Sequence, residues 1–198
     1  MDLDEYTPWL EEQVDESVRV HAAVHELLPV VMAVAEEMTA AFRDGGRVFF
    51  FGNGGSAADA QHWAAELSGR FYRDRAPLPA VALTTNTSAV TAIANDDGYD
   101  EIFVRQLAGQ ADAGDVAVGI STSGNSANVV RALRYGQDHE LVTVGVTSAG
   151  EGDMDPFCTH RIDIPSEDVA RIQEGHLLCG HLLCAVVERE LFGDDEAT

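Results

Sequence analysis

Apolar residues recur every three or four positions from Trp9 to Phe42, which is the spacing of one face of an α-helix. Pro29 interrupts this stretch, so we expect either two helices or one kinked helix. The pair Gly45-Gly46 follows Arg43 and Asp44, and glycine commonly ends a helix. The pattern therefore predicts an N-terminal helical segment over residues 1–44.

Beyond this segment, short apolar runs alternate with helical patterns. The runs that we expect to form strands are residues 47–51, 80–83, 115–120, 142–146 and 161–164. Helical patterns cover residues 57–70, 88–94, 101–108, 128–137 and 169–192. Strands that alternate with helices favour a parallel sheet covered on both faces. We predict an α/β fold, a three-layer αβα sandwich with a five-stranded parallel sheet over residues 45–198, plus the N-terminal helical extension.

The chain is unusually acidic. It has 34 acidic residues against 12 basic ones, a formal net charge of −22, and every basic residue is arginine. The acids are dispersed and leave no basic patch to release counterions from a nucleic acid, so we expect no nucleic-acid partner. An acidic, lysine-free surface also suits a salty cytoplasm, because salt screens the repulsion between surface charges. We expect a salt-adapted host.

We expect neither export nor a membrane. The apolar runs are shorter than the ~18 residues that span a bilayer, and the N-terminus is acidic where a secretory signal is basic. The three cysteines, at positions 158, 179 and 184, have no CxxC spacing, which argues against a disulfide scaffold or a cysteine zinc site. The prediction is a cytoplasmic protein with reduced thiols.

The loop after the first expected strand is rich in glycine. In a parallel sheet, ligands bind at the carboxyl ends of the strands, near the point where the strand order reverses. The loop reads Gly52-Asn53-Gly54-Gly55-Ser56 and opens a helix whose N-terminal N–H groups can bind an anion. A tight strand-to-helix turn without any ligand explains the same glycines. The loop matches neither a GKS/GKT phosphate loop nor GxGxxG, so a nucleotide is not the first expectation.

The loop after the third expected strand, residues 121–126, reads STSGNS and holds four hydroxyls in six residues. Capping of the helix that follows would need only one of these serines. Hydroxyls together with the N–H groups of a helix N-terminus can surround a phosphate without any lysine. We therefore predict that this loop binds phosphate.

GNGGS followed by STSGNS, on alternating strands and helices, resembles the sugar isomerase (SIS) domain family. Residues 119–129 (GISTSGNSANV) resemble its phosphoheptose isomerase subfamily in particular, and the resemblance continues to the last helix. It implies conversion of sedoheptulose 7-phosphate to D-glycero-D-manno-heptose 7-phosphate through an enediol. It also implies a homotetramer with active sites between subunits, in which segment 1–44 serves oligomerisation.

Moving a carbonyl between two sugar carbons requires a base that removes a carbon-bound proton and an acid that shuttles protons at the oxygens. His62 and Glu66 lie four residues apart on one face of the helix after the first loop. A surface hydrogen bond is the ordinary explanation of such a pair. The last helix offers Gln173, His176 and His181. The resemblance implies that Glu66 is the catalytic base and His181 its catalytic partner.

The resemblance also implies a metal site at His62, Glu66, Gln173 and His181, which match the positions that hold zinc in some phosphoheptose isomerases. His and Glu are ordinary zinc ligands, whereas Gln is a poor one. On a straight helix the eight residues from Gln173 to His181 span ~12 Å. One chain could bring Gln173 and His181 to the same ion only if the helix bends or their long side chains reach inward. Otherwise a neighbouring subunit would supply one of the two ligands. We expect one zinc ion per subunit.

The remaining implied residues contact the substrate. They are Asn53, Gly54, Gly55 and Ser56 in the first loop, Ser121, Thr122, Ser123 and Ser126 in the second, and Glu66, Arg70, Asn95, Asp96 and Gln173 elsewhere. Turn formation explains Asn95-Asp96 equally well, and an exposed arginine at a helix end explains Arg70. Ala170 departs from an acidic residue that some isomerases have before Arg-Ile-Gln, although Asp168 lies nearby.

Two other functions use the same fold. One is a relative that binds the bacterial replication initiator without isomerase activity, and residues 56–58, 78–80 and 91–96 resemble it at least as much as they resemble the isomerases. That branch replaces the positions matching Glu66 and His181 and interrupts the STSGNS loop with an arginine, whereas this chain keeps all of them. The other is a sugar-phosphate sensor, which is usually fused to a further domain. We favour the isomerase.

Overall fold

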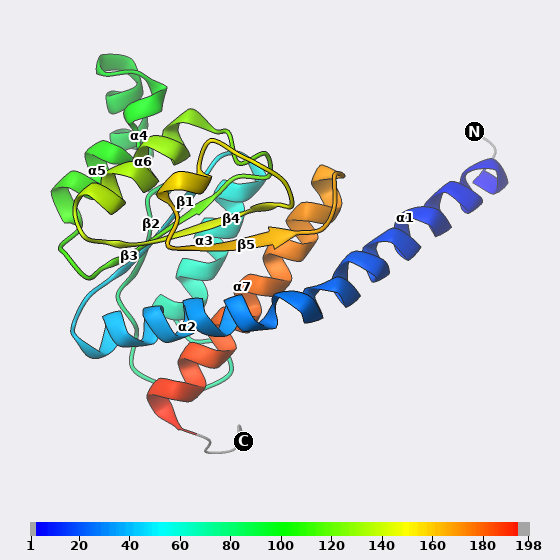
Figure 1. Cartoon of the computed structure of the whole chain (residues 1–198), viewed down its shortest axis with the longest axis horizontal. Helices are drawn as coiled ribbons and strands as arrows, with labels where there is room; N and C mark the ends of the chain where they lie inside the picture. The colour runs from blue at the N-terminus through cyan, green and yellow to red at the C-terminus, as the bar shows by residue number, and fades with distance from the viewer. Residues whose placement is uncertain (1–2, 194–198) are drawn as a thin grey trace.

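The computed structural model describes residues 3–193. Its N-terminal part is an almost continuous helix made of α1 (Leu3–Ala23), the short 3-10 helix η1 (Val24–Leu27) and α2 (Leu28–Arg43) (Figure 1). Pro29 lies in the first turn of α2, where its missing N–H costs no helical hydrogen bond. The expected interruption of this stretch is therefore a single 3-10 turn, η1, between α1 and α2. The pair Gly45-Gly46 lies just after the end of α2.

Five parallel strands form one sheet in the order β2-β1-β3-β4-β5. They are β1 (Val48–Gly52), β2 (Ala80–Ala82), β3 (Val116–Ile120), β4 (Val142–Ser148) and β5 (His160–Ile164), and each begins within one residue of a predicted strand. Gly52 at the end of β1 pairs with Ile120 at the end of β3, so the loops after these two strands start side by side. The strand order reverses here, which is where a ligand was expected.

Helices cover both faces of the sheet. On one face lie α2, α3 (Gly55–Ser68) and α7 (Val169–Phe192), and on the other α4 (Thr87–Asp96), α5 (Val104–Gln110) and α6 (Ala127–Asp138). Side chains alternate along β1, so Phe50 packs on Trp63 with 5.8 Å between ring centroids, while Phe51 packs on Phe103 at 5.2 Å. The predicted three-layer αβα sandwich with an N-terminal helical extension is confirmed.

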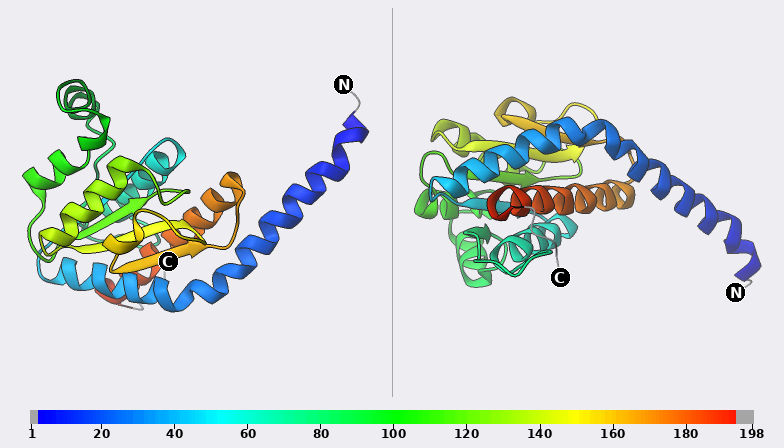
Figure 2. Two further views of the ribbon diagram at one scale, coloured as in Figure 1. Left: turned by 45° about the horizontal axis from the view of Figure 1, so that its top comes forward. Right: turned by 90° about the horizontal axis from the view of Figure 1, so that it is seen from below.

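Helix α1 extends away from the body of the protein (Figure 2). It carries a stripe of exposed apolar side chains at helical spacing: Tyr6, Trp9, Leu10, Val14 and Val18. Each of these side chains is between 47% and 64% exposed. The second half of α1 is joined to α7, because Arg171 donates to the carbonyl oxygen of Gln13 and Ser17 donates to Oε2 of Glu174, each at 2.7 Å. Helix α2 packs against α7 and the sheet. Single exposed apolar residues are common, but a continuous stripe is typical of an interaction surface.

The joined helices also contain a stretch that the search for uninterrupted apolar runs did not detect. By length and composition alone, the helical stretch Glu5–Arg43 could cross a membrane. A search for uninterrupted apolar runs does not find this stretch, because charged residues divide it into shorter runs. In the structure 28% of its most apolar window is buried, and Val31, Val34 and Met38 of α2 lie in the core. Part of the stretch therefore packs in the core as α2 while the rest is exposed on α1, and one such helix is weak evidence for a membrane span.

Candidate active site

The loop after β1 depends on glycine at two positions. Gly54 has a φ of +57°, a conformation that other residues rarely adopt. A Cβ on Gly55 would lie 2.3 Å from Nε2 of Gln173, so glycine lets the start of α3 contact α7. In this part of the described chain, no side chain caps α3. The N–H groups of Ser56 and Ala57 donate to the carbonyl oxygens of Asn53 and Gly54 at 3.0 and 3.1 Å, so α3 offers an anion mainly the positive end of its helix dipole.

Asn53 in this loop is held by two residues that the sequence analysis did not identify. Its Nδ2 donates to Oδ1 of Asn128 at 2.8 Å, and Nδ2 of Asn128 donates back to Oδ1 of Asn53 at 2.9 Å. The hydroxyl of Tyr99 donates to the same Oδ1 at 3.0 Å. Asn128 is 2% exposed and lies in the first turn of α6. Its position two residues after STSGNS is the signal that could have found it.

The STSGNS loop presents its hydroxyls at the same edge of the sheet. Oγ of Ser121 lies 2.9 Å from Oγ of Ser126 and 3.5 Å from Oγ of Ser123. Gly124 makes the turn with a φ of +68°, and its carbonyl accepts a hydrogen bond from the N–H of Met154. Ser126 precedes α6 but makes no side-chain capping bond. Helix capping therefore does not account for this serine, whose hydroxyl contacts Ser121 instead.

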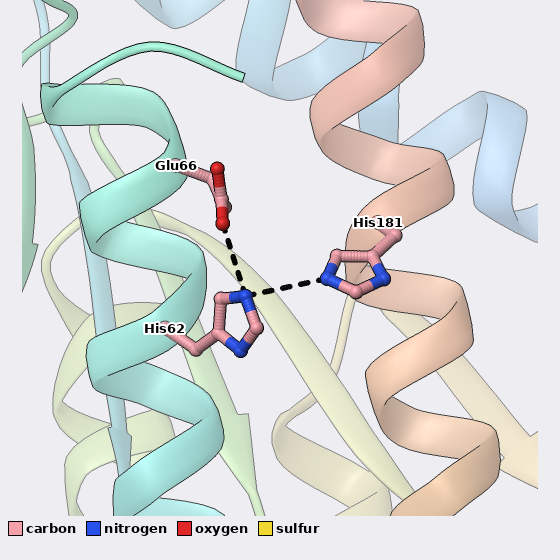
Figure 3. Close-up of side chains that lie close together, drawn as sticks. All are labelled: His62, Glu66 and His181. Atoms are coloured by element: carbon pink, nitrogen blue, oxygen red, sulfur yellow. Dashed lines mark hydrogen bonds and ion pairs between the residues drawn. The ribbon is translucent and has the colours of Figure 1, made fainter. Parts of the chain in front are cut away.

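His62, Glu66 and His181 form a cluster between α3 and α7 (Figure 3). Nε2 of His62 lies 3.0 Å from Oε1 of Glu66 and 3.3 Å from Nε2 of His181. One ligand atom from each residue lies within 4.8 Å of the other two. Two imidazoles and a carboxylate that converge in this way fit zinc or a related divalent transition metal. The cluster can therefore hold a metal ion.

Gly180 is the reason that the two helices meet at this cluster. A Cβ on Gly180 would lie 1.9 Å from Cε2 of Trp63, so no larger residue fits without moving the indole. His181 follows Gly180 and His62 precedes Trp63, so the contact turns the two imidazoles toward each other. Phe71 then covers His181, with 5.6 Å between the ring centroids and 25° between the planes.

Four other predicted positions do not belong to the group of three converging side chains. Gln173 contacts Gly55, which places it at the end of α7 nearest the loop after β1. Asn95 and Asp96 are exposed on α4, where Nδ2 of Asn95 donates to Oδ1 of Asp96 at 2.8 Å. Among the described residues, the exposed Arg70 has no ion-pair partner.

The two halves of the predicted site lie at opposite ends of α3. Ser56 is in the first turn of α3 and Glu66 in its last, and at about 1.5 Å per residue they are ~15 Å apart along the axis. Asp168, near the position of the missing family acid, caps α7 by accepting a hydrogen bond from the N–H of Ala170 at 2.8 Å. One chain therefore presents the loops after β1 and β3 and the cluster as two separate surfaces.

His176, the third polar candidate on α7, faces the sheet rather than the cluster. It is fully buried, and its Nε2 donates to the carbonyl oxygen of Thr147 at 3.1 Å. Burial lowers the pKa of His176 to about 4, although the hydrogen bond to Thr147 acts in the opposite direction. This residue is a neutral structural histidine, so it is removed from the acid–base candidates.

The lowered pKa of His176 predicts an acid-sensitive fold. Between pH 6.5 and about 4, the unfolded histidine binds a proton that the folded one does not, so stability falls as pH falls. From pH 7 to pH 4.5, wild type should lose about 2–3 kcal/mol more than the His176→Gln variant, measured by urea unfolding. The pKa of Asp59, raised by burial to about 6, acts with the opposite sign but equally in both proteins. Equal losses would contradict this prediction.

Comparisons with known proteins give the family of the chain. The SIS domain family matches residues 14–148. The phosphoheptose isomerase of Rhodospirillum rubrum is 51% identical over 163 residues, which cover 82% of this chain and 87% of the relative. That of a Roseiflexus species is 44% identical over 96% of both chains. The structure of phosphoheptose isomerase from Neisseria gonorrhoeae superposes with a TM-score of 0.86 at 38% identity, over 91% of this chain and 97% of that one. The chain therefore belongs to the SIS domain family and, within it, to the phosphoheptose isomerases.

Proposed function

We propose that this chain is an aldose–ketose isomerase that converts sedoheptulose 7-phosphate to D-glycero-D-manno-heptose 7-phosphate. The observation that carries the proposal is the convergence of His62, Glu66 and His181 in a chain that also has two phosphate-suited loops. A protein that only binds a partner has no need for an acid–base cluster of this kind. The replication-initiator binder and the sugar-phosphate sensor are therefore not favoured.

In this proposal Glu66 is the general base. Its carboxylate removes a proton from C1 of the open-chain ketose, and O2 gains a proton, which gives the enediol. Loss of the O1 proton and return of a proton to C2 then complete the aldose. His181 moves the proton between the two oxygens, since an imidazole can both donate and accept near neutral pH. Glu66 is half-buried, and Oε1 is the oxygen that contacts His62.

The substrate is held by its phosphate. The phosphate would accept hydrogen bonds from the hydroxyls of Ser121, Thr122, Ser123 and Ser126. Ser56 and the positive N-terminal end of α3 would lie on its other side. Asn53, oriented by Asn128 and Tyr99, would bind a sugar hydroxyl together with Gly54 and Gly55. The proposal keeps Arg70, Asn95, Asp96 and Gln173 as contacts to the rest of the sugar.

We propose zinc as the metal, one ion per subunit, held by His62, Glu66 and His181. Bound there, zinc would polarise the carbonyl and hydroxyl oxygens of the sugar. Gln173 would be a further ligand only if it reached the ion from a neighbouring chain, because its own side chain packs on Gly55. The convergent donor atoms support the metal, and removal by a chelator followed by zinc addition tests it.

We propose that the protein is a cytoplasmic homotetramer with active sites between subunits. The exposed apolar stripe of α1 supports this, since a second copy would cover it. The ~15 Å between Ser56 and Glu66 along α3 supports it too, because loops of one copy can complete the cluster of another. In this division, residues 1–44 serve oligomerisation and residues 45–198 form the SIS unit.

The decisive test is turnover. Purified protein in high potassium chloride, with zinc, should convert sedoheptulose 7-phosphate to an aldoheptose 7-phosphate identified by NMR. Five- and six-carbon ketose phosphates serve as competitors, because they share the reacting end and differ only in length. No turnover of any of them by folded protein would overturn the proposal. Preference for a shorter sugar would keep the reaction and replace the substrate.

A further inference from the structure

A buried ion pair lies behind the cluster and takes no part in the proposed chemistry. Nε of Arg75 lies 2.7 Å from Oε1 of Glu188, and the two side chains are 2% and 1% exposed. Among the ion pairs of the described chain, this is the one that is buried on both sides. Because removing two charges from water is costly, such a pair adds little net stability over apolar packing. Its contribution therefore lies in the backbone groups that it binds.

Glu188 holds the loop that follows α3. Its Oε2 accepts a hydrogen bond from the N–H of Tyr72 at 2.8 Å, and its Oε1 accepts one from the N–H of Phe71 at 3.2 Å. These two bonds fix the backbone of Phe71, whose ring stacks on His181. Glu188 is on α7, two turns beyond His181, so the helix that carries His181 also fixes the ring that covers it.

Arg75 holds the other half of the cluster. Its guanidinium donates to the carbonyl oxygen of Glu66 at 2.9 Å and to that of Leu67 at 2.8 Å. It also donates to the carbonyl oxygen of Gly69 at 3.3 Å, just past the last turn of α3. A cation at a helix C-terminus binds carbonyl groups that have no helical partner. The guanidinium of Arg75 thus fixes the backbone at Glu66 through its carbonyl oxygen.

We infer that Glu188 and Arg75 are positioning residues that set the catalytic carboxylate of Glu66 against the imidazole of His181. Each charge of the pair holds one catalytic residue, Arg75 through a backbone carbonyl and Glu188 through an aromatic ring. The inference rests on the proposed isomerase function for its kinetic readout, and its structural readout is independent of that function.

The test is Glu188→Gln, which keeps the shape of the side chain and removes its charge. We expect kcat to fall 10- to 100-fold while KM changes less than threefold, because the phosphate loops are untouched. The matched control is Asp115→Asn. Asp115 is another buried carboxylate, and it accepts hydrogen bonds from the N–H groups of Arg47 and Asp112, away from the cluster. This control should lose stability but keep kcat.

The imidazole NMR signals of His181 give the second readout. The ring current of Phe71 shifts these signals in wild type, and Glu188→Gln should move them toward the values of an uncovered histidine, whereas Asp115→Asn should not.

If Glu188→Gln does not fold, Phe71→Leu removes the ring without touching the ion pair and should lower kcat in the same way. Unchanged kcat in the folded variant, or an equal loss in Asp115→Asn, would overturn the inference. If wild type has no turnover, the proposed function fails and an unmoved His181 signal would by itself overturn the positioning role.

Discussion

Replacing Glu66 with glutamine should lower kcat for sedoheptulose 7-phosphate by about 10²- to 10⁴-fold, which is what a positioned general base contributes. Glutamine has the same shape and can still accept a hydrogen bond from His62, so the fold and the neighbouring helix should remain. KM should change little, because the phosphate loops lie at the other end of α3. Steady-state kinetics in high salt would measure both constants.

Glu140→Gln is the control for this substitution, since Glu140 is an exposed glutamate in the turn before β4.

Kinetics of His181→Ala should resemble those of Glu66→Gln. Mixing Glu66→Gln protein with Ser121→Ala/Thr122→Ala protein under subunit exchange should restore part of the activity, if loops and cluster of different copies form one site. Full activity of Glu66→Gln alone would exclude this carboxylate as the base.

Gly180→Ala should destabilise the protein by about 1–3 kcal/mol, the usual cost of overpacking a well-packed core. The added Cβ would lie 1.9 Å from Trp63, and that indole is itself buried on Phe50. Helix α7 must then move away from α3, so His181 would leave His62 and the metal site would weaken as well. Thermal or urea unfolding at one protein concentration, together with zinc titration, would measure both effects.

Gly109→Ala is the matched control. Gly109 is in helix α5, and a Cβ there meets nothing within 4 Å. That substitution should raise stability by about 0.5–1 kcal/mol, because alanine loses less backbone entropy than glycine in a helix. A Gly180→Ala variant as stable as wild type would mean that α3 and α7 are not in the contact described.

The strands and the positions of the loops after β1 and β3 could be predicted from the sequence, because each depends on neighbours along the chain. The Phe49–Phe51 run is a buried strand wherever it lies, and STSGNS has too many hydroxyls for a cap. The pairing of His62 with His181 could not be read from local periodicity. It depends on Gly180 meeting Trp63 across 117 positions, and only the family resemblance pointed to it.

Other long-range contacts were missed for the same reason. Asn128 holds Asn53 across 75 positions and Glu188 holds Arg75 across 113, and neither pair leaves a local pattern. Gln173 shows the reverse case. Its distance from His181 along a straight helix left two routes to one ion, namely a bend or long side chains within one chain, or a ligand from a neighbouring subunit. In this chain the side chain of Gln173 packs at Gly55 instead.

The close contact of α7 with α3 has a consequence for thiol chemistry. Cys179 and Cys184 lie on α7 on either side of His181, are at most 1% exposed, and have pKa values raised by burial to about 12. An alkylating reagent reacts with the thiolate, so at neutral pH it can modify them only while the helix is transiently lifted. The rate of their alkylation therefore measures how often the helix that carries His181 opens in the native protein, and bound metal or substrate should slow it.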